Sequence, residues 1–249
     1  MKTVFVLNGL AGQDREVEGV SAAALTLERV RRLFADVLVL QKEPGEVAGA
    51  TVLVPERPDA HRAFAAVLAA RPEAEVYLFG DLYAPLLEPA LGEKFAALTV
   101  ERTAHYTYGE HYPLGVAPHA LSRECLQVLC NVASGNYTPM DDEAFMDLIG
   151  LDINNYDIEV DVSPDDFRRS RLDLRARGAA QVKLLANIAA AAGAPLAALD
   201  YAALSAILKS RPELHRTLPG YVELDLSDNC TLACNFCPRG VMGLSGKTD

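Results

Sequence analysis

Three of the five cysteines stand close together near the end of the chain, in the sequence C-T-L-A-C-N-F-C. They are Cys230, Cys234 and Cys237, and they follow the strand-like run Y-V-E-L-D-L-S. Three thiolates that bind a four-iron cluster leave one iron without a protein ligand, and that iron can bind and reduce a small molecule. The spacing therefore predicts a [4Fe-4S] cluster with one open iron.

Zinc is the alternative metal for such a group of thiols. Structural zinc sites take four ligands, usually in two close pairs. No second close pair is present, and the nearest histidine, His215, precedes the strand-like run. Cys125 and Cys130 stand at a spacing that puts them on different faces of a helix, so they are interpreted as buried apolar residues. The iron–sulfur interpretation is therefore favoured.

The pattern C-x3-C-x2-C, with Phe236 before the last cysteine and a strand before the first, resembles the radical S-adenosylmethionine superfamily. The resemblance implies that S-adenosylmethionine binds the open iron and is cleaved reductively to a 5′-deoxyadenosyl radical, with flavodoxin or ferredoxin as electron donor. It also implies a (β/α) barrel, of which residues 218–249 would contain only the first strand and the cluster loop. We therefore expect the chain to be the N-terminal portion of a longer enzyme.

Residues 1–173 alternate between two patterns, one typical of strands and one typical of helices. The predicted strands are Thr3–Leu7, Val37–Leu40, Thr51–Val54 and Glu75–Phe79, and the predicted helices are Ala22–Phe34 and His61–Ala70. This alternation predicts a parallel, doubly wound α/β sheet, in which ligands bind at the carboxyl ends of the strands. Residues 174–217, rich in Ala and Leu and interrupted at Gly193, are expected to form a helical connector to the barrel.

Gly80 and Asp81 directly follow the strand-like run V-Y-L-F, so a carboxylate is expected at a strand tip. V-Y-L-F-G-D-L-Y-A-P, together with Y-D-I-E-V-D-V-S-P-D-D-F further along, resembles the nucleotidyltransferase fold of sugar-nucleotide and cytidylyl transferases, a GT-A-type sheet. The resemblance implies that Asp81 helps to hold Mg²⁺ and the phosphates of a nucleotide. The alternative is that Asp81 caps the turn that follows it, a position that Asp favours.

The N-terminal loop that would cradle a triphosphate has the sequence L-N-G-L-A-G-Q-D-R-E-V-E-G-V. Gly9 and Gly12 could let the backbone approach a phosphate, whereas Asn8 before Gly9 is also a plain turn signal. The loops of active nucleotidyltransferases carry a basic residue. Here no lysine follows, and Glu16 and Glu18 add negative charge. A nucleotide-binding domain without transferase activity is therefore an alternative to an active enzyme.

Other polar segments are assigned structural roles. The aromatic stretch at residues 105–113, with His119 beyond it, could line a pocket but is interpreted as packing within a loop. The alternating run D-I-E-V-D at residues 157–161 could bind a cation but is interpreted as a solvated acidic edge. The sequence S-P-D-D is expected to begin a helix with a solvated or domain-bridging basic face that includes Arg175 and Arg177.

Composition excludes some classes of partner. The formal net charge is -11 and the sequence pI is about 4.9, which argues against nucleic acid because phosphate binding requires basic patches. Apolar runs stay shorter than the ~18 residues of a membrane-spanning segment, and the N-terminus lacks the apolar region of a signal peptide. We therefore expect a cytoplasmic protein. The cytoplasm is a reducing compartment, in which clustered thiols bind metal.

The order of these parts resembles the spirochaete radical S-adenosylmethionine proteins with a C-terminal SPASM domain. This resemblance implies auxiliary iron–sulfur clusters and a peptide or protein substrate. Two hypotheses remain. In the first, the chain belongs to a radical enzyme in which residues 1–173 recognise the substrate or a nucleotide-linked group. In the second, residues 1–173 are a nucleotidyltransferase of the cytidylyl or sugar-nucleotide type, or its inactive nucleotide-binding derivative.

Overall fold

The computed structural model describes residues 2–218, except 136 and 142, and residues 223 and 224. The chain divides into two compact units, residues 1–218 and residues 219–249, and every helix and strand of the described residues lies in the first. Cys230, Cys234 and Cys237 lie outside the described residues, so the cluster loop and the barrel strand stay predictions.

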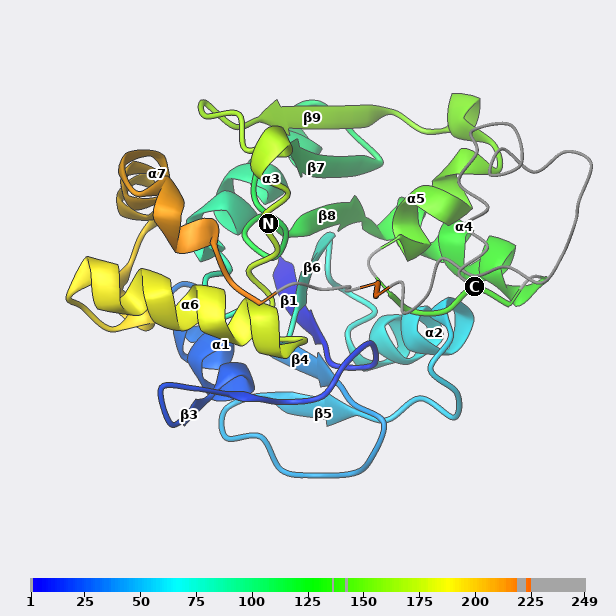
Figure 1. The fold of residues 1–249 in the computed structure, drawn as a ribbon. Helices are drawn as coiled ribbons and strands as arrows, with labels where there is room; N and C mark the ends of the chain where they lie inside the picture. Colours follow the sequence, from blue (N-terminus) through cyan, green and yellow to red (C-terminus); the bar gives the residue numbers. More distant parts are fainter. Residues whose placement is uncertain (1, 136, 142, 219–222, 225–249) are drawn as a thin grey trace, which may run out of the picture. The chain divides into compact units, whose positions relative to one another are not determined.

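The first unit is built on a seven-stranded sheet with the strand order β5-β4-β1-β6-β8-β7-β9 (Figure 1). The strands are β1 Thr3–Asn8, β4 Val37–Leu40, β5 Thr51–Leu53, β6 Val76–Asp81, β7 Tyr106–Glu110, β8 His119–Ser122 and β9 Ile158–Val162. A separate two-stranded ribbon is formed by β2 Glu16–Val17 and β3 Val20–Ser21.

The predicted doubly wound α/β sheet is confirmed in class but is mixed, not parallel. Strand β8 runs antiparallel to both β6 and β7, while β7 and β9 pair in parallel. A short loop joins β7 to β8. Strands joined by a short connection pair in antiparallel orientation, whereas a parallel pair needs a longer crossover. The prediction of a wholly parallel sheet was therefore wrong at this point.

Helices cover both faces of the sheet (Figure 1). The core on one face includes side chains of α1 Ala22–Arg31, α3 Pro89–Glu101, α6 Ala179–Ala192 and α7 Tyr201–Ser210, and the core on the other face includes side chains of α2 Ala60–Ala70, α4 Arg123–Ser134 and α5 Ala144–Gly150. Short 3-10 turns are η1 Ile153–Asn155, η2 Arg168–Ser170, η3 Leu196–Ala198 and η4 Pro212–His215. Across the part of the chain that the structure describes, no helix has the length and apolar character needed to cross a membrane.

Side chains of the central strands alternate between the two cores. Phe5 and Leu7 of β1 belong to the core beneath α1 and α3, whereas Val4 and Val6 belong to the core beneath α2 and α4. Successive side chains of a strand point to opposite faces, so an unbroken apolar run is what a sheet covered on both faces requires.

The helix predicted to begin in S-P-D-D does not form, and only the short turn η2 follows it. The Ser163 Oγ accepts from the backbone N of Asp165 at 3.2 Å, and the Asp166 carboxylate accepts from the backbone N of Arg168 at 3.0 Å. Such local bonds from Ser and Asp side chains compete with helical hydrogen bonds. The chain instead runs as an irregular segment towards the strand tips.

The prediction that Cys125 and Cys130 are buried is confirmed, since both lie on α4 with 0% and 8% of their surface exposed. Burial, with a smaller contribution from Glu124, raises the pKa of the Cys125 thiol from 9.0 to about 12. A raised pKa means that the folded protein binds the thiol proton more tightly than the unfolded chain does. This contribution to stability is present below pH 9.0 and is lost as the pH rises towards about 12.

We expect both thiols to resist modification in the folded protein at pH 8. The measurement is reaction with an aromatic disulfide reagent, using a variant in which Cys230, Cys234 and Cys237 are replaced by alanine. Cys125 and Cys130 should react only after denaturant is added. Rapid reaction of either thiol in the native variant would show that the burial is not maintained in solution.

Candidate functional site

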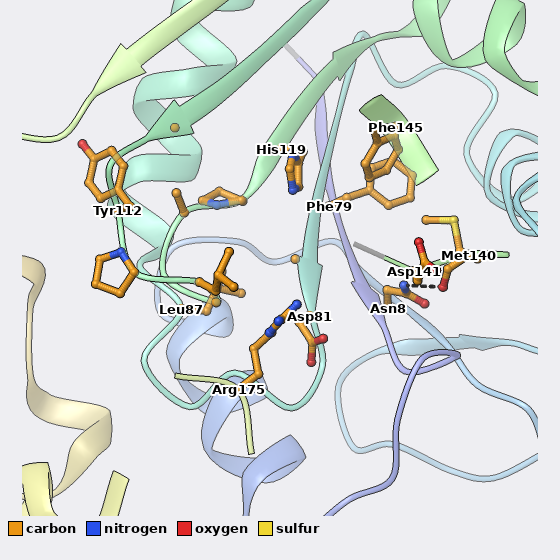
Figure 2. A pocket seen from close by; sticks show the side chains of 17 residues that line it. Asn8, Phe79, Asp81, Leu87, Tyr112, His119, Met140, Asp141, Phe145 and Arg175 are labelled. Carbon is orange, nitrogen blue, oxygen red and sulfur yellow. Dashed lines mark hydrogen bonds between the residues drawn. The ribbon is translucent and has the colours of Figure 1, made fainter. Parts of the chain in front are cut away.

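The register of the sheet brings polar residues to one edge. Asn8, the last residue of β1, pairs directly with Asp81, the last residue of β6. His119, the first residue of β8, pairs with Phe79 of β6. Because β8 runs antiparallel to β6, its first residue reaches the edge at which β1 and β6 end. A cavity of about 160 Å³ opens there (Figure 2).

Asn8 is held at both ends of its side chain. Its Nδ2 donates to the carbonyl oxygen of Met140 at 3.1 Å, and its Oδ1 accepts from the backbone N of Leu10 at 3.1 Å. The first bond, drawn in Figure 2, connects β1 to the segment before α5. The second starts the turn into the N-terminal loop. Asn8 therefore holds the Met140 wall of the cavity and the start of the N-terminal loop in place.

One wall of the cavity is aromatic (Figure 2). The Phe145 ring lies 5.1 Å from the Phe79 ring and 5.3 Å from the His119 ring, measured between centroids. The His119 Nδ1 forms a 2.6 Å hydrogen bond with the hydroxyl of the fully buried Tyr106. Burial raises the pKa of Tyr106, which therefore stays neutral. The hydrogen bond fixes the orientation of the imidazole at the edge of the cavity.

Asp81 lies at the strand tip where the sequence predicts it, and its side chain is only 7% exposed. Its Oδ1 accepts from the backbone N of Tyr83 at 2.6 Å, a bond typical of a carboxylate that caps a turn. Its Oδ2 forms an ion pair with Arg177. The carboxylate thus caps the turn and pairs with a guanidinium. Its role in binding a metal or a nucleotide stays a prediction.

Arg175 was assigned to a solvated face, but it lies at the cavity. Its guanidinium donates to both carboxylate oxygens of Asp173, from Nε at 2.7 Å and from Nη2 at 2.8 Å. The backbone N of Leu114 donates to the carbonyl oxygen of Leu172 at 2.9 Å. This bond holds the segment that contains Arg175 against the loop before β8. Gly115 has a φ of +88°, and an added Cβ there would lie 2.7 Å from the Arg175 side chain.

The carboxylate of Asp161, predicted to be part of a solvated acidic edge, is engaged from two sides. It accepts from Lys94 Nζ at 2.6 Å and from the Tyr112 hydroxyl at 2.8 Å. Burial and the neighbouring carboxylate raise the pKa of Tyr112, so its hydroxyl remains a donor. Tyr112 lines the cavity, and Asp161 orients it.

The N-terminal loop packs against an aromatic side chain. A Cβ added to Gly12 would lie 2.9 Å from Cδ2 of Tyr83, and the Tyr83 hydroxyl donates to the carbonyl oxygen of Gly9 at 3.3 Å. Tyr83 is itself buried, with 8% of its surface exposed. The two glycines therefore allow the loop to close on the Tyr83 ring.

The strand tips at Asn8 and Asp81 could be predicted from the sequence, but the contributions of Tyr112, His119 and Arg175 could not. Tyr112 and His119 were interpreted as loop packing, and Arg175 as part of a helix. The sequence does carry a signal for the position of Arg175. Its D-x-R spacing from Asp173 suits a local carboxylate–guanidinium pair. Within the described ranges, no group of three or more His, Cys, Asp or Glu side chains could hold a metal ion.

Comparison with known proteins identifies the fold. No protein-family model matches the chain, and no curated protein matches it in sequence. A cytidylyltransferase from Leptospira borgpetersenii serovar Hardjo-bovis is similar in structure, with a TM-score of 0.71 at 14% identity over 89% of this chain and 100% of that protein.

Two further solved structures are similar. The 4-diphosphocytidyl-2C-methyl-D-erythritol synthase of Anaerococcus prevotii has a TM-score of 0.55 at 11% identity, over 74% of this chain and 94% of that protein. Rv0371c of Mycobacterium tuberculosis, solved in complex with manganese, has a TM-score of 0.55 at 15% identity, over 74% of this chain and 97% of that protein. The chain therefore has a cytidylyltransferase fold over most of its length.

Proposed function

We propose that the α/β unit is a nucleotide-binding derivative of the cytidylyltransferase fold. It binds a cytidine nucleotide at the edge where β1 and β6 end, and it does not transfer nucleotidyl groups. The observation that carries the proposal is the closure of the N-terminal loop on Tyr83. Loops that cradle phosphates turn backbone N–H groups towards the anion, whereas this loop packs against the Tyr83 ring.

The cavity supports binding of the nucleoside part of the ligand. Its volume of about 160 Å³ is below the ~300–1,000 Å³ of sites that enclose a whole drug-sized ligand. It suits a base or a sugar, with the rest of the ligand outside. Phe79, Phe145 and His119 offer apolar and aromatic contacts, and Asn8 and Asp81 are polar residues of the same lining.

Calorimetric titration of the full chain with cytidine, CMP and CTP tests the proposal. Saturable binding of cytidine and CMP is expected, with CTP binding no more tightly than CMP. His119→Ala should weaken CMP binding about tenfold, the equivalent of one lost aromatic contact of about 1.4 kcal/mol. His105→Ala is the matched control, because His105 bonds to the backbone N of Asp157 and does not line the cavity.

Two results would contradict the proposal. One is the absence of binding by any cytidine ligand. The other is tight binding of CTP together with release of pyrophosphate when an alcohol or sugar-phosphate acceptor is added, because that reaction requires an open triphosphate cradle.

A second function is proposed for the chain beyond residue 218, on the spacing of Cys230, Cys234 and Cys237. We propose that these thiolates hold a [4Fe-4S] cluster that binds S-adenosylmethionine, with flavodoxin or ferredoxin as electron donor. Three thiolates leave an open iron, which supplies the reductive chemistry of radical enzymes. The nucleotide-binding unit would then recognise the substrate, a peptide or protein or a nucleotide-linked group.

Anaerobic reconstitution with iron and sulfide, followed by electron paramagnetic resonance of the reduced protein, tests this second proposal. The cluster signal should change when S-adenosylmethionine is added and should be absent from the variant with Cys230, Cys234 and Cys237 replaced by alanine. Reconstitution that yields no cluster, or a cluster whose signal ignores S-adenosylmethionine, would refute it.

A further inference from the structure

The segment V-Y-L-F-G-D resembles nucleotidyltransferases, which implies Mg²⁺ at Asp81. The protein groups that contact this carboxylate do not fit that ion. Mg²⁺ demands near-octahedral oxygen ligands, usually one or two carboxylates completed by water and phosphate. The Asp81 Oδ1 accepts the backbone N–H of Tyr83, and the Oδ2 is paired with Arg177. A guanidinium therefore lies where a cation would bind.

We propose that Arg177 takes the place of the divalent cation, so that the site binds its ligand without metal. The ligand class that follows is a nucleoside or a nucleoside monophosphate. This inference rests on the proposed nucleotide-binding function and specifies its chemistry. A guanidinium carries a positive charge at neutral pH, so Arg177 offsets the charge of the Asp81 carboxylate with which it pairs.

Backbone contacts on both sides of Arg177 hold it in position. The backbone N of Ala176 donates to the carbonyl oxygen of Tyr83 at 2.7 Å, which ties the segment to the turn after β6. The carbonyl oxygen of Arg177 accepts from Arg15 Nε at 3.1 Å, which ties it to the N-terminal loop. With 23% of its side chain exposed, Arg177 is mostly buried beside Asp81.

The charge balance around the cavity sets the preference for a ligand with few phosphates. Arg175 is paired with Asp173, Arg177 with Asp81, and Lys94 with Asp161. Each of these three cations already faces a carboxylate, so they supply little surplus positive charge. A triphosphate carries several negative charges and normally brings a metal ion that offsets them. A neutral nucleoside or a single phosphate does not need that ion.

The role of Arg177 can be tested without any nucleotide by measuring Mn²⁺ binding. Bound Mn²⁺ is detected as a decrease of the free Mn²⁺ signal in electron paramagnetic resonance. The full chain and its Asp81→Asn variant should bind Mn²⁺ equally. Arg177→Met should gain one bound Mn²⁺ per chain, and adding Asp81→Asn to it should remove that gain. Arg168→Met is the control, because Arg168 pairs with Asp166 on the exposed surface and its loss should gain nothing.

Two outcomes would overturn the inference. One is a Mn²⁺ bound by the unmodified protein and lost in Asp81→Asn. The other is an Arg177→Met variant that remains folded, as judged by circular dichroism, and gains no Mn²⁺.

If that variant does not fold, the CMP affinity of the unmodified protein tests the inference instead. Equal affinity in EDTA and in Mg²⁺ is expected, and binding that requires Mg²⁺ refutes the inference. Absence of CMP binding in both solutions would instead refute the proposed function.

Discussion

Replacing Arg29 by methionine is expected to lower the free energy of unfolding by about 3–5 kcal/mol, because it leaves a buried carboxylate without its partner. Arg29 on α1 is 4% exposed, and its guanidinium pairs with Glu88 at 3.3 Å. It also donates to the carbonyl oxygens of Leu87 at 2.9 Å and of Leu196 at 3.0 Å. One side chain thus joins α1, the turn before α3 and the segment before α7.

The electrostatics of this pair explain the size of the effect. Burial lowers the pKa of Arg29, and Glu88 acts in the opposite direction by favouring the charged form. Glu88 also accepts from the backbone N of Tyr201 at 2.9 Å, so it anchors α7 as well. Loss of the guanidinium would leave several buried acceptors unsatisfied, which is more costly than loss of a surface ion pair.

Denaturant unfolding followed by circular dichroism measures this effect. Arg31→Met is the control on the same helix, because Arg31 is exposed and its main contact is a 3.3 Å bond to the carbonyl oxygen of Ala48. The double variant Arg29→Met/Glu88→Gln should recover part of the loss, because the uncompensated charge is then removed. Equal midpoints for Arg29→Met and Arg31→Met would contradict the assignment.

Replacing Phe145 by alanine is expected to cost about 3–5 kcal/mol of stability, the range for truncation of a buried phenylalanine. Phe145 is 3% exposed and stacks on Phe64 of α2 with ring centroids 5.7 Å apart. It also lies 5.1 Å from Phe79 and forms part of the cavity wall. The truncation should therefore weaken CMP binding as well as the fold.

The neighbouring residue on the same helix provides the control for Phe145. Met146 is 41% exposed, and its replacement by alanine should change stability by no more than about 0.5 kcal/mol. Phe145→Leu should lose less than Phe145→Ala, since the larger side chain fills more of the space. A Phe145→Ala variant as stable as Met146→Ala would mean that the aromatic cluster does not support the fold.

The sheet could be predicted from the sequence because its strands are short apolar runs separated by helical patterns. Val37–Leu40 has the predicted bounds, and the predicted strand Glu75–Phe79 corresponds to β6, which places Asp81 at a strand tip. The antiparallel strand β8 was missed because H-A-L-S is short and carries no clear alternation. Its direction depends on pairing with β6 and β7, which is a tertiary property.

The positions of Arg175, Arg177 and His119 could not be predicted for a similar reason. Arg175 and Arg177 reach the strand tips only because residues 163–173 do not continue as a helix. His119 lies at the cavity because β8 runs antiparallel, and its orientation follows from the buried Tyr106 hydroxyl. Each of these positions depends on contacts between segments far apart in the sequence.

The most direct test of the central claim is an NMR titration of the isotope-labelled full chain with CMP, with the perturbed backbone amides assigned. Binding at the proposed site predicts saturable shifts at the backbone amides of Asn8, Gly80, Gly109 and Gly115, four of the residues that line the cavity. No saturable shift, or shifts confined to the separate groove lined by Val182 and Ala186 of α6, would contradict the claim that this unit is a nucleotide-binding domain with its site at the strand tips.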